Sequence, residues 1–189
     1  PEFLKGLRAL CDEKNLLLFC DEVQCGVGRT GHWFGFQSYG IQADGCSLAK
    51  GLGGGIPIGA FIVGPKVSEV FQPGHHASTF GGNPVAIAAS LATLELLEES
   101  LIENARLVGD YMLARLNEWV RKYDVVGDVR GLGLVAGIEY VQSKDTKEWF
   151  PAKVGAAARV FAEALKRGVF VRLLGGGNVH AIAPPFVIS

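Results

Sequence analysis

One lysine, Lys50, lies between an apolar run and a glycine-rich turn within residues 46–60. Small or apolar residues occupy positions 47–49, and four glycines follow the lysine within five positions. Because glycine adopts backbone conformations that other residues rarely adopt, we expect a sharp turn here and an amine with little polar company. An amine in partly apolar surroundings loses its proton more readily. Lys50 is therefore a candidate nucleophile for Schiff-base formation with a carbonyl group.

Three other interpretations of this stretch compete with a nucleophilic lysine. A phosphate-binding P-loop requires Gly-Lys-Ser/Thr at the end of its turn, whereas Lys50 precedes the turn. The dinucleotide-binding fingerprint fails because Ile56 stands where its third glycine is required, and Pro57 would interrupt the following helix. The third alternative is an ordinary solvated lysine on an exposed face.

Two carboxylates, Asp21 and Glu22, directly follow an apolar run at residues 16–20. Such a run is typical of a strand buried on both faces of a parallel sheet, and residues 2–14 before it have helical spacing. In open α/β sheets ligands bind beyond the carboxyl ends of the strands, so Asp21 is a functional candidate; the alternative is an acidic residue that caps a turn. A second short strand before Lys50 predicts that Asp21 and Lys50 lie on neighbouring strand ends.

Length, charge and cysteine content limit the class of protein. The chain has 189 residues, of which 49% are hydrophobic and 20% charged, and its formal net charge is −1. Near-neutral charge predicts no nucleic-acid partner and no membrane partner, and no run approaches the roughly 18 apolar residues of a membrane span. The four cysteines form no Cys-x-x-Cys pair, which favours reduced thiols and a cytoplasmic location. His75 and His76 have no carboxylate at ligand spacing, so we expect no metal site.

The remaining patterns predict an α/β chain with two domains. Helical patterns cover residues 84–97, 101–122 and 152–167, and strand patterns cover 123–130, 134–141 and 169–173. We expect the first domain at residues 1–100, carrying Lys50, and a smaller C-terminal domain at 101–189 that is entered by a linking helix. The chain starts at Pro1 and stops in a strand-like segment, so we expect a fragment of a longer protein.

Three longer motifs resemble one known family. They are Asp21-Glu-Val-Gln24 with Gly28-Arg-Thr-Gly31, Ser47-Leu-Ala-Lys50 with Gly53-Gly-Gly-Ile-Pro-Ile-Gly-Ala60, and Ser78-Thr-Phe-Gly-Gly-Asn-Pro84. In this order they resemble the class III (subgroup II) pyridoxal-phosphate-dependent aminotransferases, and within that class the acetylornithine and ornithine aminotransferases. The resemblance implies a fold type I transferase. Its α/β architecture would comprise part of a large domain, with a mainly parallel sheet, and a smaller C-terminal α/β domain.

The resemblance also implies a role for each matched position. Lys50 would bind pyridoxal 5'-phosphate as a Schiff base and then shuttle the substrate proton. Asp21 would pair with the pyridine nitrogen of the cofactor, and Gln24 would bind on the side of its phenolic oxygen. Ser78 and Thr79 would bind the cofactor phosphate of the neighbouring subunit, which implies a homodimer with shared active sites. The amino donor would be N-acetylornithine or ornithine and the acceptor 2-oxoglutarate, as in arginine metabolism.

One position departs from the family pattern. Ala181 stands where the family usually has an arginine that binds the substrate carboxylate, and His180 and Arg172 are candidates for replacing it. The departure leaves the amino donor open, so another ω-transaminase or an aminomutase of the 4-aminobutyrate type stays as an alternative. A catalytically incompetent fragment or scaffold is the other alternative, because the family's upstream phosphate loop would precede Pro1.

Overall fold

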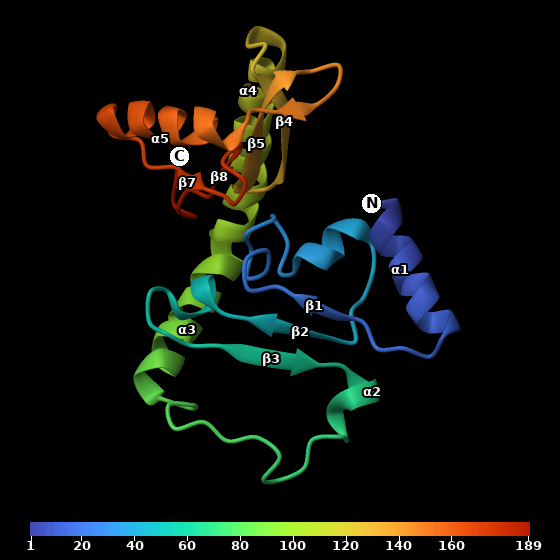
Figure 1. The fold of residues 1–189 in the computed structure, drawn as a ribbon. Helices are drawn as coiled ribbons and strands as arrows, with labels where there is room; N and C mark the ends of the chain where they lie inside the picture. Colours follow the sequence, from blue (N-terminus) through green and yellow to red (C-terminus); the bar gives the residue numbers. More distant parts are fainter. The chain divides into compact units, whose positions relative to one another are not determined.

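The computed structural model describes all residues from 1 to 189 as two compact units, Pro1–Glu103 and Asn104–Ser189. Figure 1 shows both units, coloured from the N-terminus to the C-terminus. Each unit has its own sheet. No helix of either unit is long and apolar enough to cross a membrane.

The first unit is built on a three-stranded sheet in the order β1-β2-β3 (Figure 1). Its strands are β1 Phe19–Asp21, β2 Gly45–Leu48 and β3 Ala60–Val63, and its helices are α1 Glu2–Glu13, α2 Pro65–Ser68 and α3 Pro84–Leu96, with 3-10 turns at Gly35–Tyr39 and Lys50–Gly53. Strands β1 and β2 are parallel, whereas β2 and β3 are antiparallel. This sheet of the first unit therefore has one parallel and one antiparallel strand pair. The expected α/β class is confirmed by the mixture of helices and sheets.

Strand β1 is shorter than the apolar run that predicted it. The amide of Leu16 donates to the carbonyl of Cys11 at the end of α1, and the amide of Leu18 donates to the side chain of Asp44. These two amides therefore donate to groups outside the sheet, and the hydrogen-bonded pairing of β1 with β2 begins only at Phe19. The strand ends at Asp21, directly after the apolar run.

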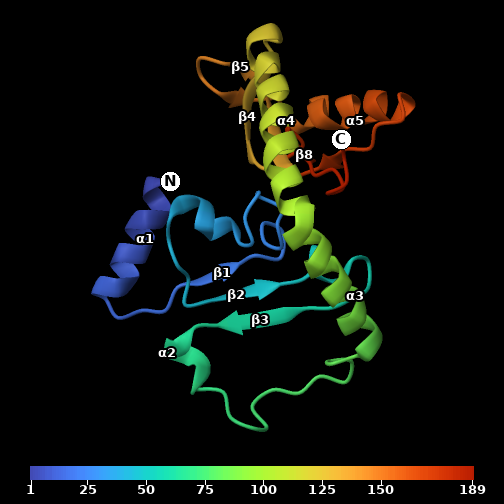
Figure 2. The same cartoon turned by 180° about the vertical axis from the view of Figure 1, so that it is seen from behind.

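Helix α3 begins at a proline and has a side-chain cap. Asn83 accepts hydrogen bonds from the amides of Val85 and Ala86, at 3.0 and 3.1 Å, and Pro84 occupies the first helical position. The helix packs against the turn that begins at Lys50 (Figure 2). A π-helical turn, Leu97–Leu101, connects it to the next helix.

The second unit has an antiparallel sheet in the order β4-β5-β8-β7, with β6 paired to β5. Its elements are α4 Ile102–Lys122, β4 Val126–Leu132, β5 Val135–Ser143, β6 Glu148–Trp149, a 3-10 turn at Ala152–Val154, α5 Ala156–Lys166, β7 Arg172–Leu173 and β8 Val179–Ile182. Helix α5 begins later than residue 152 because Gly155 has a left-handed backbone conformation, with φ of +58°, that separates it from the 3-10 turn.

The core of the second unit lies on one face of this sheet. Strand β5 alternates, so that Ala136, Ile138 and Tyr140 are buried while Gly137 and Glu139 are partly exposed. Helix α4 contributes Leu116, and helix α5 contributes Ala157, to the same cluster. On the opposite face of β5, Glu139 accepts hydrogen bonds from Arg130 and from the indole of Trp149.

Candidate active site

Asp21 and Lys50 lie at the carboxyl ends of two adjacent parallel strands. Asp21, the last residue of β1, pairs in register with Ser47 of β2, and Lys50 comes two residues after the end of β2. The hydroxyl of Ser47 and the amide of Val23 donate to Oδ1 of Asp21, at 3.3 and 3.0 Å. Because both donors reach Oδ1, the second oxygen of this exposed carboxylate, Oδ2, is left for a ligand.

The Lys50 side chain is held by Gln24, which lies in the loop after β1. Nζ of Lys50 donates a hydrogen bond to Oε1 of Gln24, and both residues are exposed. The expectation that the amine has few polar neighbours is therefore wrong, because the loop after β1 places the side-chain amide of Gln24 within hydrogen-bonding distance of it. Lys50 also has a left-handed backbone conformation, with φ of +48°, which is uncommon for residues other than glycine.

Glu22, next to Asp21, has a structural role that sequence analysis did not assign. Its side chain is buried, and its carboxylate accepts hydrogen bonds from the amides of Gly35 and Phe36, at 2.7 and 3.1 Å. Successive strand residues point to opposite faces, so Asp21 faces the site while Glu22 points into the protein. Glu22 thereby anchors the loop that carries Gln24. This role could have been inferred from the sequence, because two adjacent acidic residues at the end of a strand must point to opposite faces.

The cysteines around this strand pair have protonated, packed thiols. Burial, with a smaller contribution from Glu22, raises the pKa of Cys46 to about 11. Burial is also the largest cause of the raised pKa values of Cys20 and Cys25. No group of three or more His, Cys, Asp or Glu side chains in the chain is arranged to hold a metal ion.

Ser78 and Thr79 lie apart from the group around Lys50. Both are exposed, in the segment between α2 and α3 that extends away from the sheet in both views (Figures 1 and 2). Ser78 accepts a hydrogen bond from the amide of Gly81 through Oγ, at 3.1 Å. The chain thus brings Lys50, Gln24 and Asp21 to one end of the sheet and leaves Ser78 and Thr79 elsewhere.

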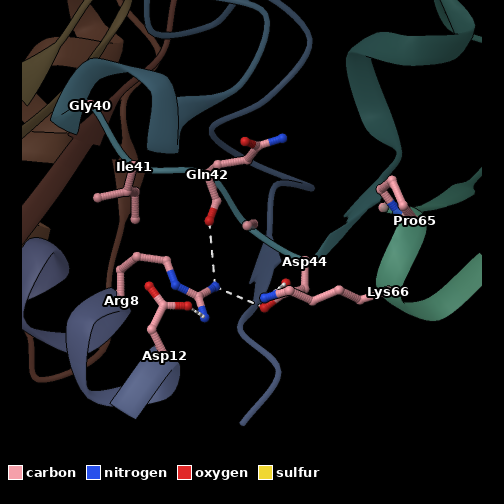
Figure 3. A pocket seen from close by; sticks show the side chains of 10 residues that line it. Arg8, Asp12, Gly40, Ile41, Gln42, Asp44, Pro65 and Lys66 are labelled. Carbon is pink, nitrogen blue, oxygen red and sulfur yellow. Dashed lines mark hydrogen bonds and ion pairs between the residues drawn. The ribbon is translucent and has the colours of Figure 1, made fainter. Parts of the chain in front are cut away.

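A polar pocket of about 620 Å³ lies at the amino end of β2, the opposite end of the strand from Lys50 (Figure 3). Asp44 is its central group: Oδ2 accepts from Arg8 and from the amide of Leu18, both at 2.8 Å, and Oδ1 lies 3.1 Å from Nζ of Lys66. The Leu18 amide and these cations lower the pKa of Asp44 to about 2. The acid is thus fully partnered, which indicates a structural ion network rather than a reactive site.

A lysine amine beside an amide and a carboxylate, at the ends of parallel strands, defines a site suited to carbonyl chemistry. The model of the family Aminotransferase class-III matches residues 1–189, and the chain belongs to this family. Acetylornithine aminotransferase of Nitrosomonas europaea is 45% identical over 172 residues, which cover 90% of this chain and 40% of that protein. The leucine/methionine racemase of Thermococcus litoralis is 39% identical, covering 100% of this chain and 42% of the racemase.

Solved structures give the same family. Ornithine delta-aminotransferase of Plasmodium falciparum matches with a TM-score of 0.86 and 33% identity, covering 100% of this chain and 47% of that structure. An amine transaminase of an uncultivated Pseudomonas species, in its pyridoxal-phosphate-bound form, matches with a TM-score of 0.90 and 36% identity. The match covers 97% of this chain and 43% of that structure. The fold type I assignment is thereby confirmed. The chain spans less than half the length of each of these four proteins.

Family membership indicates pyridoxal phosphate as the cofactor. The donor groups around Lys50 fit this molecule chemically. Lys50 offers a primary amine for its aldehyde, Oδ2 of Asp21 offers a negative acceptor for a protonated ring nitrogen, and Gln24 offers an amide for a ring oxygen. The residues present are thus of the kinds that the cofactor requires.

Proposed function

We propose that the protein to which this chain belongs transfers an ω-amino group from N-acetylornithine or ornithine to 2-oxoglutarate, with pyridoxal phosphate as cofactor. The observation that carries the proposal is the placement of Lys50, Gln24 and Asp21 at the carboxyl ends of β1 and β2. The relatives named acetylornithine aminotransferase and ornithine delta-aminotransferase support the choice of donor.

The chain's own residues would divide the work at this site. When bound, pyridoxal phosphate supplies an aldehyde and an electron-withdrawing ring. Asp21 would use its free oxygen to hold a proton on the ring nitrogen, because a neighbouring carboxylate favours the charged form. Lys50 would hold the cofactor covalently and then carry a proton to and from the substrate carbon that bears the amino group. Gln24 would keep Nζ of Lys50 in place and orient the ring oxygen.

We further propose that Ser78 and Thr79 bind the cofactor phosphate of a neighbouring subunit, in a cytoplasmic homodimer with shared active sites. Two observations support this assignment. Both residues are exposed, and they lie on the segment between α2 and α3, which loops out from the sheet (Figure 1). Hydroxyl groups in such a position are available to a site that another copy of the chain completes.

A second candidate is a transaminase that acts on a different ω-amine, such as 4-aminobutyrate, or an aminomutase of that type. The observation that favours it is Ala181, which brings no charged group to the position where the family resemblance places a carboxylate-binding arginine. The match to a solved amine transaminase is consistent with this alternative. A non-catalytic scaffold is the third candidate, and the experiment described next distinguishes it from the other two.

The test is borohydride reduction of the full-length protein with pyridoxal phosphate, followed by peptide mass spectrometry. We expect a pyridoxyl adduct on Lys50, its loss in Lys50→Ala, and its retention in Lys5→Ala, a control that removes an exposed lysine. N-acetylornithine, ornithine and 4-aminobutyrate are then compared as donors with 2-oxoglutarate. Folded protein without an adduct on Lys50 would exclude the aminotransferase mechanism and favour the scaffold.

A further inference from the structure

The loop that carries Gln24 begins at Glu22, whose main chain holds it against the neighbouring strand. The amide of Glu22 donates to the carbonyl of Ser47 at 3.0 Å, one position beyond the end of β1. The carbonyl of Glu22 accepts from the amide of Gly26 at 2.8 Å. Gln24 lies inside the turn that this second hydrogen bond closes, so the main chain of Glu22 fixes the start of the loop.

The side chain of Glu22 holds the far end of the same loop. It is 4% exposed, and its carboxylate accepts from the amides of Gly35 and Phe36 at 2.7 and 3.1 Å. Hydrogen bonds to a charged acceptor are about twice as strong as those between neutral groups, and a buried carboxylate that loses them is costly. One buried side chain thus joins parts of the chain that are 13 and 14 residues apart.

Close packing transmits this restraint to Gln24. A Cβ placed on Gly35 would lie 3.0 Å from Cβ of Cys25, the residue next to Gln24. A Cβ placed on Gly26 would lie 2.9 Å from Cβ of Glu22. Because neither glycine leaves room for a side chain, the turn that carries Gln24 is enclosed between Glu22 and Gly35. A shift of this turn would break at least one of these contacts.

The Lys50 amine lies at the end of this series of contacts. Nζ of Lys50 donates a hydrogen bond to Oε1 of Gln24, although both residues are exposed. Two flexible exposed side chains lose rotamer freedom when they form such a bond, so a fixed backbone on each side favours it. The turn packed against α3 fixes the backbone of Lys50, and Glu22 fixes the loop that carries Gln24.

We propose that Glu22 is a positioning residue for Lys50 and acts through Gln24. Its buried carboxylate keeps the loop closed, and the closed loop places the amide that holds the amine. The use of the amine rests on the proposed function, whereas the positioning can be measured in protein without cofactor.

The test is a double-mutant cycle in the cofactor-free full-length protein, measured at Lys50. Acetic anhydride acetylates free amines, and mass spectrometry gives the rate of labelling of Lys50 relative to that of Lys5, an exposed lysine of α1. A hydrogen bond to Oε1 of Gln24 favours the ammonium form, which is not nucleophilic, so loss of this bond should make Lys50 react faster. We expect Gln24→Ala and Glu22→Gln each to raise the relative rate about threefold to tenfold.

The cycle separates positioning from an independent structural effect. If Glu22 acts through Gln24, the double variant Glu22→Gln/Gln24→Ala should react at most about twofold faster than the faster single variant. Asp44→Asn is the matched control, because it removes another buried carboxylate that accepts from a backbone amide, at the opposite end of β2. This control should change the rate less than twofold.

Three results would each overturn the assignment. They are an unchanged rate in either single variant, effects that multiply in the double variant, and an equal effect of Asp44→Asn. If circular dichroism shows that Glu22→Gln is unfolded, Glu22→Asp takes its place. Its carboxylate is one methylene shorter and cannot reach both amides, so Lys50 should again react faster than in the wild type. An unchanged rate in Glu22→Asp would equally overturn the assignment.

The outcome is separate from the test of the proposed function, because acetylation of Lys50 does not require pyridoxal phosphate. A pyridoxyl adduct on wild-type Lys50, together with a labelling rate that does not depend on Glu22, would refute the positioning role alone. Coupled effects of Glu22 and Gln24, in protein that forms no adduct on Lys50, would refute the aminotransferase mechanism and keep the positioning role.

Discussion

Replacement of Asp44 by asparagine should destabilise the first unit by an amount that depends on pH. The Asp44 side chain is 8% exposed, and its two oxygens accept from Arg8, Lys66 and the amide of Leu18 (Figure 3). The pKa of Asp44 is about 2, compared with an ordinary value of 3.8. Each pKa unit corresponds to about 1.4 kcal/mol, so the charged form contributes about 2 kcal/mol to the free energy of unfolding at neutral pH.

The sign of the pH dependence follows from the lowered pKa. Between pH 3.8 and 2 the unfolded chain takes up the proton before the folded chain does, so the contribution of Asp44 is complete above pH 3.8 and declines as the pH falls toward 2. At pH 3 about half of it should be lost. Asp44→Asn should therefore be less stable than wild type by about 2 kcal/mol at pH 7, and the difference should narrow by about 1 kcal/mol at pH 3.

The assay is urea unfolding of the full-length protein, followed by circular dichroism at pH 7 and at pH 3. Asp12→Asn is the matched control, because Asp12 also pairs with Arg8 at 2.8 Å but its side chain is 57% exposed. Exposed ion pairs contribute at most about 1 kcal/mol, so this control should change stability little. Equal effects of the two substitutions, or an Asp44→Asn difference that is the same at both pH values, would refute the reasoning.

Three further substitutions should change stability, two in the second unit and one in helix α1 of the first. A Cβ on Gly109 of α4 would lie 2.3 Å from the carbonyl carbon of Gly133, so Gly109→Ala should lower the free energy of unfolding by about 2 kcal/mol or more. Gly6→Ala in α1, where a Cβ meets open space, should raise it by up to about 1 kcal/mol in the same denaturation assay, and a loss at Gly6 would contradict the helix argument. His180 is buried with Nδ1 2.9 Å from Oη of Tyr140, and burial lowers its pKa from 6.5. Below pH 6.5 the histidine of the unfolded chain therefore takes up a proton more readily than the buried His180 does. The free energy of unfolding should be constant above pH 6.5 and should decrease as the pH falls below it. In His180→Gln this decrease should be smaller in unfolding curves recorded between pH 7 and pH 5.

The candidate site was predictable where it depends on strand ends. An apolar run that stops at Asp21, and a short strand that stops before Lys50, were enough to place both residues at one edge of a sheet. Their strands pair in parallel, with Asp21 opposite Ser47. The roles of these residues in catalysis stay predictions.

Contacts that depend on the path of a loop were not predictable. Gln24 meets Lys50 because the loop after β1 folds back, and that path depends on the buried Glu22, whose partners Gly35 and Phe36 are 13 and 14 residues away. Nothing in local spacing indicates such distant hydrogen bonds. The same holds for the start of β1, where the Asp44 side chain takes the amide of Leu18 from 26 residues further along the chain.

Backbone strain connects these loop contacts to the proposed chemistry. Val27 and Lys50 both have left-handed backbone conformations, with φ of +54° and +48°. Such conformations cost about 1–2 kcal/mol for residues other than glycine, and more for the β-branched Val27. Val27 is buried within the loop that Glu22 anchors, and Lys50 begins the turn packed against α3. The charge-assisted hydrogen bonds of Glu22 can offset the cost at Val27, since each is worth about 1.5–3 kcal/mol. Backbone strain thus occurs at Lys50 and in the loop that carries its partner Gln24. Its presence at both places supports a functional reason for holding the Lys50 amine in this position.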